Sequence, residues 1–250
     1  RMLQIYRAAA GYGIDGIHLI TIRGGPMVMY EKEMLERFRE RFGTKVDPRK
    51  LPLHEERVWR VRTELFGEYL RRLRATMHQA ARVAGHKPPL ISMHGLCTQT
   101  AMRTFGLDFK SWAQQGLVDR IVASPWGEEF GAEKCEWPDF DVKFYLDCVK
   151  GTKTELVAEV WRPRPGKDIG RYYLKWIEKW RKRGLKQFAF WDTNQRHPNA
   201  EHFAALSVLG HERDLRKQIE ISSKRYRQVT LKTLLGIELA KDRFPPWICG

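Results

Sequence analysis

Five short runs of mostly apolar residues, each followed by a segment with helical spacing, constrain this chain more than any other feature. The runs predict strands at residues 14–22, 88–95, 117–126, 153–163 and 186–194. Such continuous apolar runs are typical of parallel strands that are covered on both faces. Strands that alternate with helices, without hairpin signals, are joined by right-handed crossovers. The pattern therefore predicts an α/β fold with one parallel sheet.

The helical segments and the length of the chain favour part of a barrel. Helices are expected at residues 1–12, 31–42, 54–84, 108–115, 139–150, 168–183 and 199–209. A (β/α)8 barrel needs about 250 residues, and a helix precedes the first strand. We therefore expect a TIM-barrel-like fold with only the last five βα units, and three more units upstream of Arg1. Residues 1–212 are assigned to the barrel and residues 213–250 to a C-terminal extension of the same domain.

A five-stranded doubly wound α/β domain fits the same number of units. The chain lacks the glycine-rich fingerprint of dinucleotide-binding folds. Polar and aromatic residues also follow nearly every predicted strand, which is where barrel enzymes build their sites. The barrel is therefore the preferred interpretation.

The strongly basic composition raises the possibility of a nucleic-acid partner. The chain has 45 Lys and Arg against 30 Asp and Glu, a net charge of +15. Most of these cations lie between core positions and glutamates of the helical segments, as on solvated helix faces. No nucleic-acid motif accompanies them. The four cysteines have neither zinc-site nor disulfide spacing, and no run is long enough for a membrane span.

Three segments resemble one known family. They read GIDGIHL (residues 13–19), ERFGTKVDP (40–48) and FGLDFKSWAQQGLVDRIVASPW (105–126). They are similar to segments of the bacterial glycoside-hydrolase-like (β/α)8 proteins described as family 10-like. The resemblance covers residues 10–200 and implies that the predicted strands are strands four to eight of such a barrel. It also implies a carbohydrate substrate and a secreted or periplasmic location. The family motif has an acid two residues beyond His18, where this chain has Ile20.

Hydrolysis of a glycosidic bond needs a carboxylic acid and a second carboxylate at strand ends. Glu159 lies near the end of the fourth predicted strand and is the candidate nucleophile or base. Glu31 and Asp192 are the candidate acids. Each has a structural alternative: Glu159 as a buried acid paired with an arginine, Glu31 as a first-turn helix acid, and Asp192 as a turn or helix-cap acid.

Candidate substrate-binding residues follow the same strand ends. Arg23 can hold a carboxylate or sugar hydroxyls with its planar guanidinium, and His94 can donate to either. Flat aromatic rings suit the apolar faces of sugars, which predicts saccharide platforms at Trp126, Trp161 and Trp191. His18, His94 and Asp192 have the residue types of a metal site, but no metal and no cofactor is expected.

The sequence leaves three functions open. The leading hypothesis is a carbohydrate-active domain that hydrolyses glycosidic bonds of a poly- or oligosaccharide with a carboxylate pair. The second is a catalytically inactive saccharide-binding barrel, which the loss of an acid at Ile20 favours. The third, less favoured hypothesis is a basic protein that binds nucleic acid or another anionic polymer.

Overall fold

The structure, a computed structural model, describes residues 1–21, 25–127, 139–161 and 169–190, with short pieces at 213–214, 217, 233–234 and 237–238. The chain divides into two compact units, Arg1–Glu159 and Val160–Gly250. Across the described residues, no helix is both long enough and apolar enough to cross a membrane.

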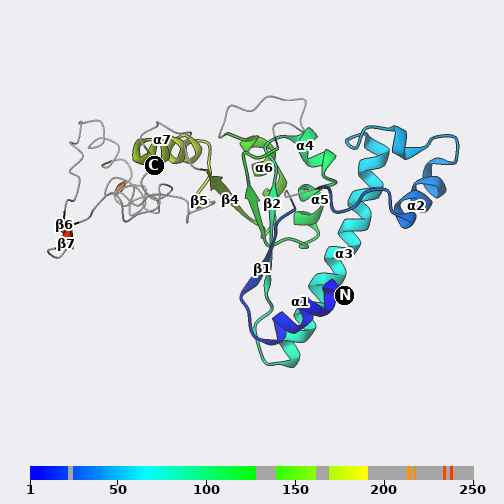
Figure 1. The fold of residues 1–250 in the computed structure, drawn as a ribbon, viewed down its shortest axis with the longest axis horizontal. Helices are drawn as coiled ribbons and strands as arrows, with labels where there is room; N and C mark the ends of the chain where they lie inside the picture. Colours follow the sequence, from blue (N-terminus) through cyan, green and yellow to red (C-terminus); the bar gives the residue numbers. More distant parts are fainter. Residues whose placement is uncertain are drawn as a thin grey trace. The chain divides into compact units, whose positions relative to one another are not determined.

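Five parallel strands form one sheet, and their order in the sheet is their order in the sequence, β1-β2-β3-β4-β5. They are β1 (Gly16–Leu19), β2 (Leu90–Gly95), β3 (Arg120–Ala123), β4 (Glu155–Val160) and β5 (Gln187–Phe190). Helices lie between successive strands (Figure 1). The predicted α/β fold with a parallel sheet is thereby confirmed.

The first four strands present one apolar face and one largely polar face. Ile91, Met93, Ile121, Ala123 and Ala158 of the apolar face are fully buried. On the other face, the register aligns a polar row across the sheet: His18, Ser92, Arg120 and Glu155. Side chains alternate along a strand, so His94 and Glu159 belong to this polar face, nearer the carboxyl ends. His18, Ser92, His94 and Glu159 therefore lie on one side of the sheet.

The helices of the first unit are α1 (Met2–Gly11), α2 (Lys32–Phe42), α3 (Glu56–Val83), α4 (Gln99–Thr104), α5 (Phe109–Gln114) and α6 (Val142–Val149), with a short 3₁₀ helix at Pro48–Lys50. The long helix α3 begins where the Glu55 carboxylate accepts the backbone N–H groups of Arg57 and Val58. It ends before Gly85, whose φ of 75° is a left-handed conformation that glycine adopts without strain.

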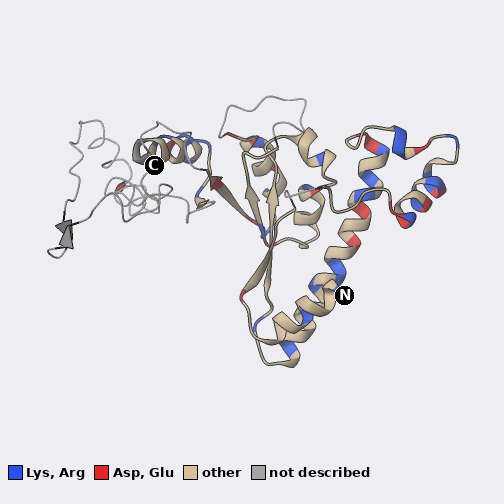
Figure 2. Cartoon of the chain, in the orientation of Figure 1, with Lys and Arg blue, Asp and Glu red and all other residues tan. Residues whose placement is uncertain are grey.

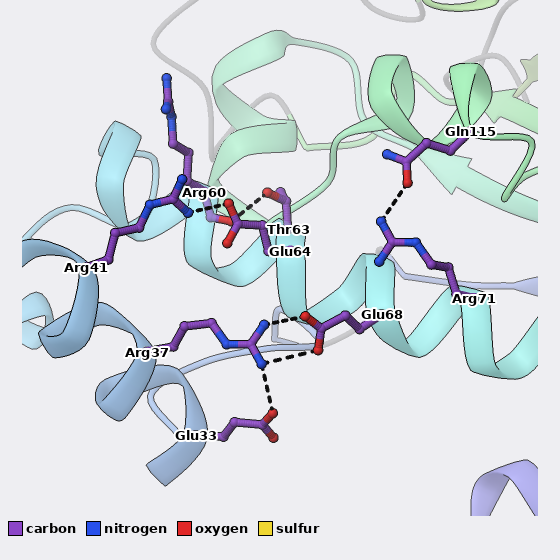
Figure 3. A network of polar contacts seen from close by, with 9 residues as sticks. All are labelled: Glu33, Arg37, Arg41, Arg60, Thr63, Glu64, Glu68, Arg71 and Gln115. Atoms are coloured by element: carbon purple, nitrogen blue, oxygen red, sulfur yellow. Dashed lines mark hydrogen bonds and ion pairs between the residues drawn. The ribbon is translucent and has the colours of Figure 1, made fainter.

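Helix α2 packs on the N-terminal half of α3 through a small apolar core. Met34 and Phe38 of α2 and Val58 and Val61 of α3 are all fully buried. Arg37 and Arg41 of α2 reach across to Glu68 and Glu64 of α3 (Figure 3). These ion pairs are partly exposed and are each worth at most about 1 kcal/mol, so the buried side chains dominate the packing.

Residues 105–126, the longest segment of the family resemblance, form a capped helix followed by a buried strand. Asp108 caps α5 by accepting the N–H of Ser111, and Trp112 on α5 is buried. Asp119 then pairs with Arg74 of α3 and accepts the backbone N–H of Ile91. Burial opposes ionisation of Asp119, but these partners hold the pKa of its carboxyl below the usual value. This acid therefore links α3 to the start of the sheet.

In the second unit, helix α7 (Ile169–Lys182) packs on β5 through aromatic side chains. Trp180 stacks on Phe188, and Tyr173 meets Phe190 edge to face. Trp176 and Trp180 are buried, as expected of packing residues. Two short antiparallel strands, β6 (Thr233–Leu234) and β7 (Ile237–Glu238), complete the described elements.

Some elements differ from their predicted bounds. The strands are shorter than the apolar runs, and β1 alternates between exposed and partly buried residues. Burial in β1 alternates with a period of two because successive side chains point to opposite faces of the sheet, of which one is polar. Helix α4 was not expected; Thr98 caps it by accepting the N–H of Ala101. The helix expected at residues 199–209 lies outside the described residues.

Candidate functional site

Three side chains from the carboxyl ends of three strands form the centre of the candidate site. His18, His94 and Glu159 are each the penultimate residue of their strand, in β1, β2 and β4 respectively. Parallel strands bring such positions to the same edge of a sheet, where barrel enzymes carry their sites. The strand register staggers them: His18 is level with Ser92, two residues before His94, and Glu159 lies two residues beyond Val157, which is level with His94 across β3. Their common face and common edge of the sheet therefore bring together residues that are distant in the sequence.

The three side chains form a continuous hydrogen-bonded chain that begins at Ser92. The Ser92 hydroxyl lies 2.9 Å from Nδ1 of His18, and Nε2 of His18 lies 2.6 Å from Nδ1 of His94. Nε2 of His94 lies 2.6 Å from Oε1 of Glu159. This last contact crosses β3, which separates β2 from β4 in the sheet. We call these four residues the Ser92–Glu159 chain.

The inner end of the Ser92–Glu159 chain is buried and the outer end reaches solvent. The side chains of Glu159 and His94 are 2% and 3% exposed, whereas His18 is exposed and Ser92 partly buried. Loss of water around the imidazole, followed by the proximity of His94, lowers the pKa of His18 to about 4. At neutral pH His18 is therefore an uncharged imidazole that can either donate or accept a hydrogen bond.

The surroundings of His94 fix its backbone. The Thr21 hydroxyl donates to the carbonyl oxygen of His94 at 3.0 Å, and Thr21 is itself buried. Next to His94, a Cβ at Gly95 would overlap the Tyr145 hydroxyl, which donates to the Leu96 carbonyl oxygen at 2.6 Å. A glycine at this position therefore lets α6 approach the end of β2 closely.

The structure brings together two of the predicted site residues, His94 and Glu159. Glu31 is exposed at the start of α2, where its carboxylate accepts the N–H of Met29 at 2.8 Å. Trp126 and Trp161 follow β3 and β4, and both are partly exposed. Arg23, Asp192 and Trp191 lie outside the described residues. Ile20 comes directly after β1, and 46% of its surface is exposed.

Sequence reasoning missed Ser92 and considered His18 only as a possible metal ligand with His94 and Asp192, not as a site residue. A signal for both was present in the two-residue alternation of polar residues with apolar ones. In β2, the polar residues Ser92 and His94 are separated by the apolar Met93. In β4, Glu155 and Glu159 lie four residues apart and therefore on the same face of the strand. Reading the runs as uniformly apolar hid this alternation.

The arrangement suits proton transfer better than metal binding. The ring nitrogens of His18 and His94 are hydrogen-bonded to each other directly. In the part of the chain that the structure describes, no group of three or more His, Cys, Asp or Glu side chains is placed to hold a metal ion. A buried carboxylate joined to two imidazoles can instead accept, donate and pass on a proton.

Comparison with known proteins bears on the fold. No family model and no curated protein matches this sequence. One similar solved structure is the PgaB (BpsB) glycoside hydrolase domain from Bordetella bronchiseptica, with a TM-score of 0.55 and 15% sequence identity. The match covers 83% of this chain and 60% of that chain, so this chain spans about 60% of that neighbour's length. That domain is a (β/α)8 fold, and the five parallel strands with the helices between them therefore form an α/β fold of the TIM-barrel type.

Proposed function

We propose that this chain belongs to a carbohydrate-active barrel that hydrolyses glycosidic bonds, with Glu159 as its essential carboxylate. The observation that carries the proposal is the position of Glu159. It is buried at the carboxyl end of a barrel-type strand and hydrogen-bonded to His94 at 2.6 Å. The fold similarity to a glycoside hydrolase domain supports the same chemistry by analogy.

Cleavage of a glycosidic bond requires an acid that protonates the leaving oxygen. It also requires a base that activates water, or a nucleophile that attacks the sugar directly. Ile20 stands where the resembled family has an acid, so the second acidic group must come from another element. Asp192 and Glu31 remain our candidates for the general acid. Arg23, Trp126, Trp161 and Trp191 are proposed to bind the saccharide.

The test is release of reducing sugar from a panel of polysaccharides and aryl glycosides by wild type and Glu159→Gln. Glutamine keeps the shape of glutamate but removes its negative charge. We expect the variant to lose at least a hundredfold in rate. Glu155→Gln is the matched control. It lies on the same strand, partly exposed and paired with Arg120 at the other end of the polar face, and we expect it to keep most of the rate.

A second function, an inactive saccharide-binding barrel, is favoured by Ile20 and by the near-complete burial of Glu159. It predicts saccharide binding without sugar release by any variant, measured by calorimetry on the same panel. Equal release by wild type and Glu159→Gln would instead contradict the assignment of Glu159.

A further inference from the structure

We propose that His18 is the general base that contacts the attacking water, and that His94 is a positioning residue that connects it to Glu159. This inference rests on the proposed glycosidase function and assigns the base of that same site. In this assignment Glu159 does not contact the substrate or the attacking water, and it acts through the two histidines as the final proton acceptor.

Accessibility is the first argument. Glu159 and His94 are 2% and 3% exposed, so the described side chains around them leave almost no surface for water or a sugar. His18 is exposed on β1, the first strand of the sheet. Of the two histidines and the carboxylate, only His18 therefore offers atoms to a ligand.

The direction of the hydrogen bonds is the second argument. An ionised Glu159 can only accept, so Nε2 of His94 must donate to it. A neutral His94 then has a lone pair on Nδ1 and accepts from Nε2–H of His18. This leaves the lone pair of His18 on Nδ1, where the Ser92 hydroxyl donates. The Ser92 hydroxyl rotates about a single bond and can give way to water at this lone pair.

The proton balance closes along the same path. When water attacks the anomeric carbon, its oxygen forms the new bond and its proton passes to Nδ1 of His18. The Nε2 proton of His18 moves to Nδ1 of His94, and the Nε2 proton of His94 moves to Glu159. The glycosidic C–O bond breaks, and the leaving oxygen takes its proton from a carboxylic acid that acts as the general acid. Both histidines end neutral, so neither has to hold a positive charge near the other.

Nitrogen-15 NMR of the histidine rings tests the hydrogen-bond direction without requiring any substrate. We expect His18 and His94 to carry their protons on Nε2 between pH 6 and 8. A proton on Nδ1 of His18, or protons on both nitrogens of His94, would overturn the relay. His54→Gln, which changes an exposed histidine in the loop before α3, is the matched control and should leave both tautomers unchanged. Because this measurement needs no turnover, failure of the relay is distinguishable from failure of the proposed function.

Kinetics on an accepted substrate tests the role of His18. His18→Ala should lower kcat about a hundredfold or more with little change in KM, and added imidazole should restore part of the rate. His94→Gln should lower kcat without rescue by imidazole. His54→Gln, at an exposed histidine outside the Ser92–Glu159 chain, should retain the rate within a few-fold. A His18→Ala protein that folds, judged by its thermal melt, and keeps full kcat would contradict the assignment.

Discussion

At the scale of single residues, His18 combines exposure with a depressed basicity. Its pKa is lowered to about 4 by loss of water around the ring and by His94, whereas a histidine in an unfolded chain has a pKa near 6.5. The unfolded chain therefore binds a proton between these values that the folded chain does not. Stability from this group is complete above pH 6.5 and is lost as the pH falls towards 4.

This linkage predicts a pH-dependent stability difference between wild type and His18→Gln. Between pH 7 and pH 4.5, the urea midpoint of wild type should fall by more than that of the variant, because glutamine does not titrate. His54→Gln, which changes an exposed histidine in the loop before α3, is the matched control and should behave as wild type. An equal fall in wild type and His18→Gln would show that His18 does not carry the effect.

At the scale of elements, Arg62 holds three connecting segments around α3. Its guanidinium donates to the carbonyl oxygen of Val28 after β1, of Leu53 before α3 and of Thr104 at the end of α4, at 2.7, 3.1 and 2.9 Å. Arg62 is fully buried, and burial lowers its pKa to about 10, so it stays charged at neutral pH. One side chain therefore donates to carbonyl oxygens that no hydrogen bond within a strand or helix satisfies.

Arg62→Leu is expected to destabilise the protein by about 3–5 kcal/mol, because it leaves several buried carbonyl oxygens without a donor. Arg37→Leu on α2 is the control, since Arg37 is partly exposed in its pair with Glu68 and should cost at most about 1 kcal/mol. Urea unfolding measures both. Similar costs for the two variants would mean that the carbonyl groups around Arg62 find other partners.

At the scale of the whole molecule, charge is distributed unevenly along the chain. The N-terminal half of α3 carries glutamates that pair with arginines, but no Asp or Glu occurs between Glu68 and Asp108. Figure 2 shows the C-terminal half of α3 with basic residues, which are all arginines, and without Asp or Glu. Arg72, Arg82 and Lys87 are exposed in this stretch. These cations give the first unit a basic side without any motif that reads a nucleic acid.

This distribution predicts weak, salt-sensitive binding to any polyanion. In fluorescence anisotropy, the protein should bind duplex DNA at about 20 mM salt and release it near 150 mM, as expected for contacts with phosphates alone. Charge reversal at Arg82 and Lys87 should weaken the low-salt binding further. Tight binding that persists at 150 mM salt would favour the third function considered from the sequence, a nucleic-acid or anionic-polymer binder.

Local patterns were enough to predict most elements of the fold. The apolar periodicity predicted a helix at residues 54–84, and α3 begins and ends within two residues of those bounds. The segment at residues 105–126 predicted a helix and a strand, which are α5 and β3. Helix α4 was missed because it has only 6 residues, which is too short for an apolar periodicity to be recognised. The bounds of the strands were overestimated because apolar residues continue into the connections.

By itself, the sequence determined the α/β class and the succession of strands and helices along the chain, since both depend on local periodicity. It also placed His94 and Glu159 near strand ends, where their roles stay predictions. Only the tertiary structure decided that Ser92, His18, His94 and Glu159 form one hydrogen-bonded chain. Strand register and the crossing of β3 set those contacts, and both depend on how distant segments pack. Spacing along the chain carries no information on which side chains meet across a sheet.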